Sequence, residues 1–98
     1  MKFTIAPEVL ENLMKQAGVA RPKKSDAFTL SASAGRVSVE FKGVTAGIVA
    51  PISAEGAVKL PAKNFRAMLD SYKGTPALNF EGGPEWLRIE NFKMPVLA

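Results

Sequence analysis

The feature of this sequence that most constrains its fold is an internal repetition, because two halves of the chain carry the same order of patterns. In the first half, residues 3–5 lead into apolar residues at helical spacing that end at Gly18. In the second half, residues 58–60 lead into a similar series that ends at Gly74. Each half therefore predicts a strand followed by a helix. The apolar helical positions are Val9, Leu10, Leu13, Met14 and Ala17 in the first half, and Phe65, Met68, Leu69 and Tyr72 in the second.

Each predicted helix is followed by runs that alternate with period two, a pattern typical of β-hairpins. A further strand is predicted in each half, from Val44 to Ile52 and from Phe92 to Leu97. The last connection is short, at Glu90-Asn91-Phe92, so either a tight hairpin or one long strand is expected there. The predicted hairpin strands, in chain order, are 28–32, 37–41, 77–80 and 86–89.

Together these patterns predict a pseudo-twofold α+β fold of two tandem β-α-β-β-β units. The apolar stripes of both helices are expected to pack side by side on antiparallel sheet. With 98 residues, 47% of them hydrophobic and 22% charged, the chain is typical of one globular domain over 1–98. The methionine and aromatic positions are expected to fill its core, and no cofactor or metal site is predicted.

The composition narrows the possible chemistry. The chain has no cysteine and no histidine, which excludes disulfides, thiolate zinc sites and most familiar catalytic groups. The nine acidic residues are scattered, so we expect no enzyme, and a minimal carboxylate enzyme is the weakest reading. Because no apolar run is long enough for a membrane helix or a signal peptide, a cytoplasmic protein is expected.

Three segments resemble the bacterial sliding clamp, the beta subunit of DNA polymerase III. They are the opening MKFTI before a helix, the strands of GRVSVEFKGVTAGIVAPI, and GAVKLPAKNFRAML around the second helix. Their order and nearly gapless spacing cover almost the whole chain and resemble the first clamp domain. The resemblance implies a DNA-clamp fold whose helices face double-stranded DNA and whose edge strands pair with neighbouring domains.

The sequence also departs from the clamp pattern. After the first helix, clamps usually carry a longer apolar segment around a proline, whereas residues 21–26 are short and basic. A bacterial clamp has three such domains per chain, so a closed ring of this chain would need about six copies. The polymerase-binding pocket of bacterial clamps lies in the later domains and is not carried over.

Candidate DNA-binding residues lie on the predicted helices and on the loop after the first one. Arg21-Pro22 resembles an arginine-proline pair at the same place in clamps, where the arginine contacts DNA; a solvated arginine before a rigid proline is the alternative. Lys23 and Lys24 are flexible charges suited to phosphate contact. Further candidates, for which a solvated helix face is the alternative, are Lys15, Lys63, Arg66 and Lys73.

The distribution of charge also favours the helices and the loop as the DNA-binding surface. They carry seven basic against four acidic residues, whereas the strands and their turns carry six against five. The net charge of +4 agrees with an anionic partner. Trp86 alternates with Leu87 and Ile89, so it is predicted on the opposite sheet face, either as a subunit contact or as ordinary surface packing.

No motif for reading bases is present, so any DNA binding should be independent of sequence. The sequence therefore favours a clamp-like DNA-binding protein that self-assembles, such as a ring-type processivity or replication accessory factor. The alternative is a protein-interaction module on the same fold, for example a phage or plasmid factor that acts on host replication proteins without binding DNA.

Overall fold

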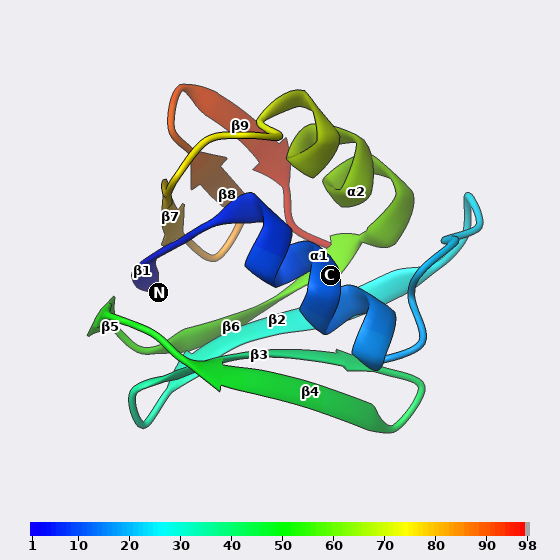
Figure 1. Ribbon diagram of the computed structural model, residues 1–98, viewed down its shortest axis with the longest axis horizontal. Coiled ribbons are helices and arrows are strands. Elements are labelled where there is room, and N and C mark those ends of the chain that lie inside the picture. The colour runs from blue at the N-terminus through cyan, green and yellow to red at the C-terminus, as the bar shows by residue number, and fades with distance from the viewer. Residues whose placement is uncertain (98) are drawn as a thin grey trace.

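The computed structural model describes residues 1–97, and within them both predicted helices form beside two antiparallel sheets (Figure 1). The α+β class is therefore confirmed. Neither helix in this part of the chain is long and apolar enough to cross a membrane. The elements are β1 (Lys2–Ile5), α1 (Pro7–Gln16), β2 (Ala27–Ser33), β3 (Arg36–Phe41), β4 (Val44–Val49), β5 (Ile52–Ala54), β6 (Gly56–Pro61), α2 (Ala62–Ser71), β7 (Leu78–Gly82), β8 (Trp86–Ile89) and β9 (Phe92–Pro95).

The ends of the helices follow from local chemistry. α1 begins at Pro7, whose fixed φ and missing N–H suit the first helical turn. It ends at Gln16, and Gly18 just beyond it has φ of +90° and lets the N–H of Val19 donate to the carbonyl of Met14 at 2.7 Å. α2 follows Pro61 and is closed by Gly74, again with φ of +90°. Both predicted glycine stops are confirmed.

The two halves of the chain are interleaved rather than side by side. The sheets run in the orders β5-β1-β7-β8-β9 and β4-β3-β2-β6. The first strand of each unit therefore joins the other unit's hairpin, as the pairs Phe3–Phe80 and Phe28–Leu60 show. Neither unit has a complete sheet of its own, so each needs the other in order to fold.

The predicted strand from Val44 to Ile52 is wrong in its extent. β4 ends at Val49, and Ala50-Pro51 carries the chain across to β5 in the other sheet. Pro51 has no N–H for a ladder, and its carbonyl accepts a hydrogen bond from the N–H of Thr4 at 3.4 Å.

The C-terminal strand is also shorter than predicted. β9 ends at Pro95, and the N–H of Leu97 donates to the carbonyl of Lys59 on β6 at 2.8 Å. Before β9, Glu90-Asn91 forms a tight hairpin turn, so the alternative of one long strand is wrong.

Three hairpins turn on a residue other than glycine in the left-handed region, Ala34, Lys42 and Glu90, and in the first two a glycine with positive φ follows. Ala34 and Gly35 have φ of 52° and 74°, and Lys42 and Gly43 have 50° and 83°. Positive φ at both central residues defines the type I′ turn, which favours Asn-Gly. Alanine and lysine at the first position are therefore strained, and this strain lowers stability.

We expect Ala34→Asn to raise the free energy of unfolding by about 0.5–1 kcal/mol, since asparagine tolerates positive φ. For a domain of this size that is a rise in Tm of roughly 3–6 °C, to be measured by circular dichroism. Ala57→Asn is the control, because Ala57 is exposed in β6 with negative φ, and it should not stabilise. Equal stabilisation by both variants would contradict the explanation.

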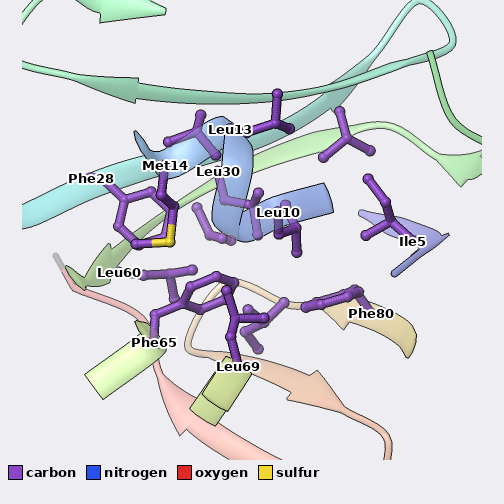
Figure 2. Packing of buried hydrophobic residues seen from close by; sticks show 14 of the residues in the cluster. Ile5, Leu10, Leu13, Met14, Phe28, Leu30, Leu60, Phe65, Leu69 and Phe80 are labelled. Carbon is purple, nitrogen blue, oxygen red and sulfur yellow. The ribbon is translucent and has the colours of Figure 1, made fainter. Parts of the chain in front are cut away.

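The core between the sheets is built from side chains of both halves (Figure 2). The ring of Phe3 stacks on Phe80 with centroids 4.8 Å apart. Phe65 on α2 lies 6.4 Å from Phe80 and makes an edge contact with Phe28 at 5.1 Å. Met14, Met68 and Met94 are buried like these rings, which confirms the predicted core role for them, whereas Phe92 is 44% exposed.

Candidate nucleic-acid interface

The two helices lie antiparallel, so that the start of one is beside the end of the other. At one end, the N–H of Gly74 after α2 donates to Glu8 Oε1 in the first turn of α1, at 3.1 Å. At the other end, the N–H of Ala62 at the start of α2 donates to the carbonyl of Asp26 at 2.9 Å. The loop that follows α1, residues 20–26, therefore lies beside the N-terminus of α2 (Figure 1).

Charge is unevenly divided between the two ends of this helical layer. The end that carries the loop, here called the basic end, has five cationic side chains against the carboxylates of Asp26 and of Glu11, which contacts Lys15 and Arg66. The opposite end has Lys73 against Glu8 and Asp70. The structure thus brings five of the seven candidates to one end and leaves Lys73 away from them. The five are Lys15, Arg21, Lys23, Lys24 and Lys63.

The loop at the basic end is shaped by Asp26. Its N–H donates to the carbonyl of Lys23 at 3.0 Å, and its Oδ2 accepts the N–H of Lys23 at 2.8 Å. The carboxylate of Asp26, the one acidic group of the loop, therefore binds the loop backbone and not the side chain of a neighbouring lysine or arginine. The side chains of Arg21, Lys23 and Lys24 are exposed and form no ion pair or hydrogen bond within residues 1–97. They are the charges most available to an anionic ligand.

The two lysines on the helices near the loop differ in their surroundings. Lys63 is exposed in the first turn of α2. Lys15 lies in the last turn of α1 with its side chain 51% exposed, and its Nζ is 3.4 Å from Glu11 Oε1. Glu11 is 19% exposed and is also bound by Arg66 at 3.0 Å, so the half-exposed Lys15 can exchange it for another anion without leaving Glu11 unpaired.

Arg66 is the candidate whose surroundings differ most from a solvated helix face. Its Nη2 donates to Glu11 Oε1 at 3.0 Å and its Nη1 to the carbonyl of Ala20 at 2.8 Å. Its side chain is only 19% exposed. Its partner Glu11 was not predicted from the sequence. The sequence repeat held a signal for this pair. Glu11 and Arg66 are each the fifth residue of a helix of 10 residues, and middle positions lie opposite each other when two repeated helices pack antiparallel.

Two sheet edges leave apolar side chains exposed beside the core. On β4, Val44 is 49% and Ile48 39% exposed, although the residue between them on the same face, Ala46, is buried. On β9, Phe92 is 44% exposed beside buried Met94. Strands β4 and β9 are outer strands of different sheets. Only Trp86 was predicted from the sequence as a possible subunit contact, and these edge residues were not, since period two does not show which strand is an edge.

Trp86 lies on the face opposite to buried Leu87 and Ile89, as predicted. Its ring is partly covered, because Lys93 Nζ lies 4.7 Å from the ring centroid and Gly83 packs against it. Lys93 therefore already occupies one face of the ring, which agrees with the surface-packing reading.

No family model matches this sequence, and no curated protein is similar to it at a significant level. Solved structures are similar over the whole chain. The Helicobacter pylori beta clamp bound to a DNA ligase peptide has a TM-score of 0.82 and 19% identity, covering 100% of this chain and 31% of that chain. DNA polymerase III subunit beta from Borrelia burgdorferi has a TM-score of 0.84 and 12% identity, with coverage of 100% and 31%.

The DNA polymerase III subunit beta of Pseudomonas aeruginosa has a TM-score of 0.79 and 18% identity, and covers 100% of this chain and 30% of that chain. This chain thus spans about a third of the length of the proteins it resembles. The resemblance drawn from the sequence is confirmed for the fold: the described chain has the architecture of a single domain of a bacterial beta clamp.

Proposed function

We propose that this protein binds double-stranded DNA independently of sequence, assembles with copies of itself, and serves as a clamp-like replication accessory factor without enzymatic activity. The observation that carries the proposal is the basic end, where five cations outnumber two carboxylates that already have partners, Asp26 within the loop and Glu11 with Arg66 and Lys15. The clamp-domain fold supports the same function, because the similar structures are beta clamps.

The basic end suits the phosphate backbone rather than the bases. Exposed lysine and arginine side chains bind DNA largely by releasing the counterions condensed on it. Arg21, Lys23 and Lys24 lie on one short loop, so all three can reach neighbouring phosphates of one strand or of both. Lysine is a point charge that needs no fixed ligand geometry, which agrees with binding independent of sequence.

The proposal is tested by replacing the three loop charges together. We expect Arg21→Gln/Lys23→Gln/Lys24→Gln to lower duplex affinity by about a hundredfold near 100 mM salt. The slope of log affinity against log salt should fall by about 2–3, since each lost phosphate contact removes about 0.9. Fluorescence anisotropy with labelled duplexes of two unrelated sequences measures both quantities.

The matched control is Lys2→Gln/Arg36→Gln/Lys59→Gln, which removes the same charge from exposed strand positions. Each of these residues neighbours a buried residue of its strand, so it faces away from the core. We expect this control to lower affinity only a few fold. An equal loss in both triple variants would contradict a localised interface, and no binding by the natural sequence at 50 mM salt would overturn the proposed DNA binding.

Self-assembly is supported by the edges of β4 and β9. Both leave core-facing apolar side chains exposed, Val44 and Ile48 on one and Phe92 on the other. The two edges belong to different sheets, so one edge of a copy meeting the other edge of the next gives a head-to-tail contact. Repeated contacts of this kind form a ring if the rotation closes.

The open β4 edge also supports the second candidate, a protein-interaction module. An unpaired edge strand can accept an extended segment of another protein as a further strand. A protein that stays monomeric and ignores DNA at low salt, but binds a replication protein through this edge, would favour that function over the first.

A further inference from the structure

We propose that Arg66 is a positioning residue, which holds the start of the basic loop in place for DNA without contacting DNA itself. The inference rests on the proposed DNA binding. It assigns to Arg66 a role that differs from that of the exposed lysines around it, because its guanidinium is turned into the protein.

The guanidinium of Arg66 joins three segments of the chain. The side chain comes from α2, Nη2 binds Glu11 on α1 at 3.0 Å, and Nη1 binds the carbonyl of Ala20 at 2.8 Å. Ala20 is the residue before Arg21. A planar fork with fixed donors can hold both acceptors at once, whereas a lysine ammonium on a flexible chain cannot reproduce that geometry.

The segment that Arg66 holds has few other anchors. Val19 is buried and its N–H is bound by the helix end, and the turn closed by Asp26 begins at Lys23. Between them, residues 20–22 have no regular secondary structure. Within residues 1–97, residues 20–22 make only one hydrogen bond, which the carbonyl of Ala20 accepts from Arg66. The direction in which Arg21 leaves the helix therefore depends on it.

This arrangement leaves one donor of Arg66, the N–H of Nε, without a hydrogen bond. This atom is buried without a hydrogen-bond partner, since its nearest carboxylate oxygen, on Asp70, is 3.9 Å away. Leaving a buried N–H unpaired opposes folding. Both Nη atoms bind other segments of the chain, whereas Nε stays unpaired. The guanidinium is therefore oriented toward Ala20 and Glu11 and not toward Asp70 on its own helix.

Arg66→Lys tests the inference because it retains the charge and removes the fork. Hydrogen exchange without DNA is the first measurement. We expect the amides of Lys23 and Asp26, which are hydrogen-bonded within the loop, to exchange about fivefold to tenfold faster, while β2 stays protected, since only local opening is affected. Lys63→Gln is the control, because the side chain of Lys63 is exposed on the same helix and forms no hydrogen bond or ion pair within residues 1–97. It should leave loop exchange unchanged.

DNA affinity is the second measurement. We expect Arg66→Lys to weaken duplex binding about threefold to tenfold at unchanged net charge, because the loop must be ordered again on binding. Should the variant unfold, Glu11→Gln is measured instead: it weakens the contact that orients the guanidinium, so exchange at Lys23 and Asp26 should rise about twofold, and an unchanged rate would overturn the anchoring role. Unchanged loop exchange in Arg66→Lys would overturn the anchoring role.

Two outcomes separate this inference from the proposed function. If the natural sequence binds no DNA, the proposed function fails, while loop exchange still decides whether Arg66 anchors the loop. If the natural sequence binds DNA and Arg66→Lys loosens the loop without weakening binding, DNA binding stands and the positioning role is overturned.

Discussion

Phe65→Ala is expected to lower the free energy of unfolding by about 3–5 kcal/mol, the usual effect of removing a buried aromatic ring. Phe65 is fully buried on α2, between Phe28 of the four-stranded sheet and Phe80 of the five-stranded sheet. Domains of this size have about 5–15 kcal/mol of stability, so the variant should be partly unfolded at 37 °C.

Urea unfolding followed by circular dichroism measures this loss. Phe92→Ala is the control, since Phe92 is 44% exposed at the β9 edge and should lose well under half as much. The single tryptophan, Trp86, lies in the five-stranded sheet, so its fluorescence reports on that sheet alone. Each sheet contains strands from both halves of the chain, so we expect the unfolding transition measured by Trp86 fluorescence to coincide with the one measured by circular dichroism. Separate transitions would contradict a jointly folded core.

The order and type of the elements could be predicted because local patterns encode them. Period two marks strands and the 3.6-residue period marks helices, so even the bounds of β8, Trp86–Ile89, agree with the predicted run. Glycines at 18 and 74 fixed the helix ends through their positive φ. These signals act over a few residues, which is why they can be read without a structure.

The interleaving of the sheets could not be predicted in the same way. β1 pairs with β7 across more than seventy residues of sequence, and the alternating pattern of Phe3 and Ile5 fits either sheet. The crossing at Pro51 was hidden because Val44, Ala46, Ile48 and Ala50 keep one period through it. The missing N–H of proline was the only local signal that the ladder stops there.

For the candidate site, residue types could be predicted but not their partners. The short basic loop with Lys23 and Lys24 was identified from the sequence, and both side chains are exposed as a phosphate contact requires. Arg66 looked like one more charge on a solvated helix face. Its contacts with Glu11 and Ala20 depend on how two helices cross, which no local pattern records. The roles of these residues in DNA binding stay predictions.

The other large effect is expected at the β4 edge, where Ile48→Asp should prevent self-assembly. Ile48 pairs with buried Val37 and faces the core side of the sheet, yet it is 39% exposed because no strand covers this edge. A second copy that adds its β9 edge there would bury it. A carboxylate without a partner in that contact should weaken association by roughly 3 kcal/mol or more, over a hundredfold.

Light scattering on a sizing column measures the mass at several concentrations and at low and moderate salt. The natural sequence should form particles larger than the 10.5 kDa chain, and Ile48→Asp should stay monomeric with unchanged circular dichroism. Thr45→Asp is the control, because Thr45 lies on the opposite face of β4, where its carboxylate stays in water.

The β9 edge can form few backbone hydrogen bonds with a second copy. Pairing of β8 with β9 alternates from the tight turn at Glu90-Asn91, so Lys93 and Pro95 direct their backbone groups to the free edge. Pro95 has no N–H, so backbone bonds across the contact are few and apolar burial at Ile48 and Phe92 must supply most of the affinity. Retained assembly in Ile48→Asp would contradict this, and a monomer at all concentrations in the natural sequence would remove self-assembly altogether.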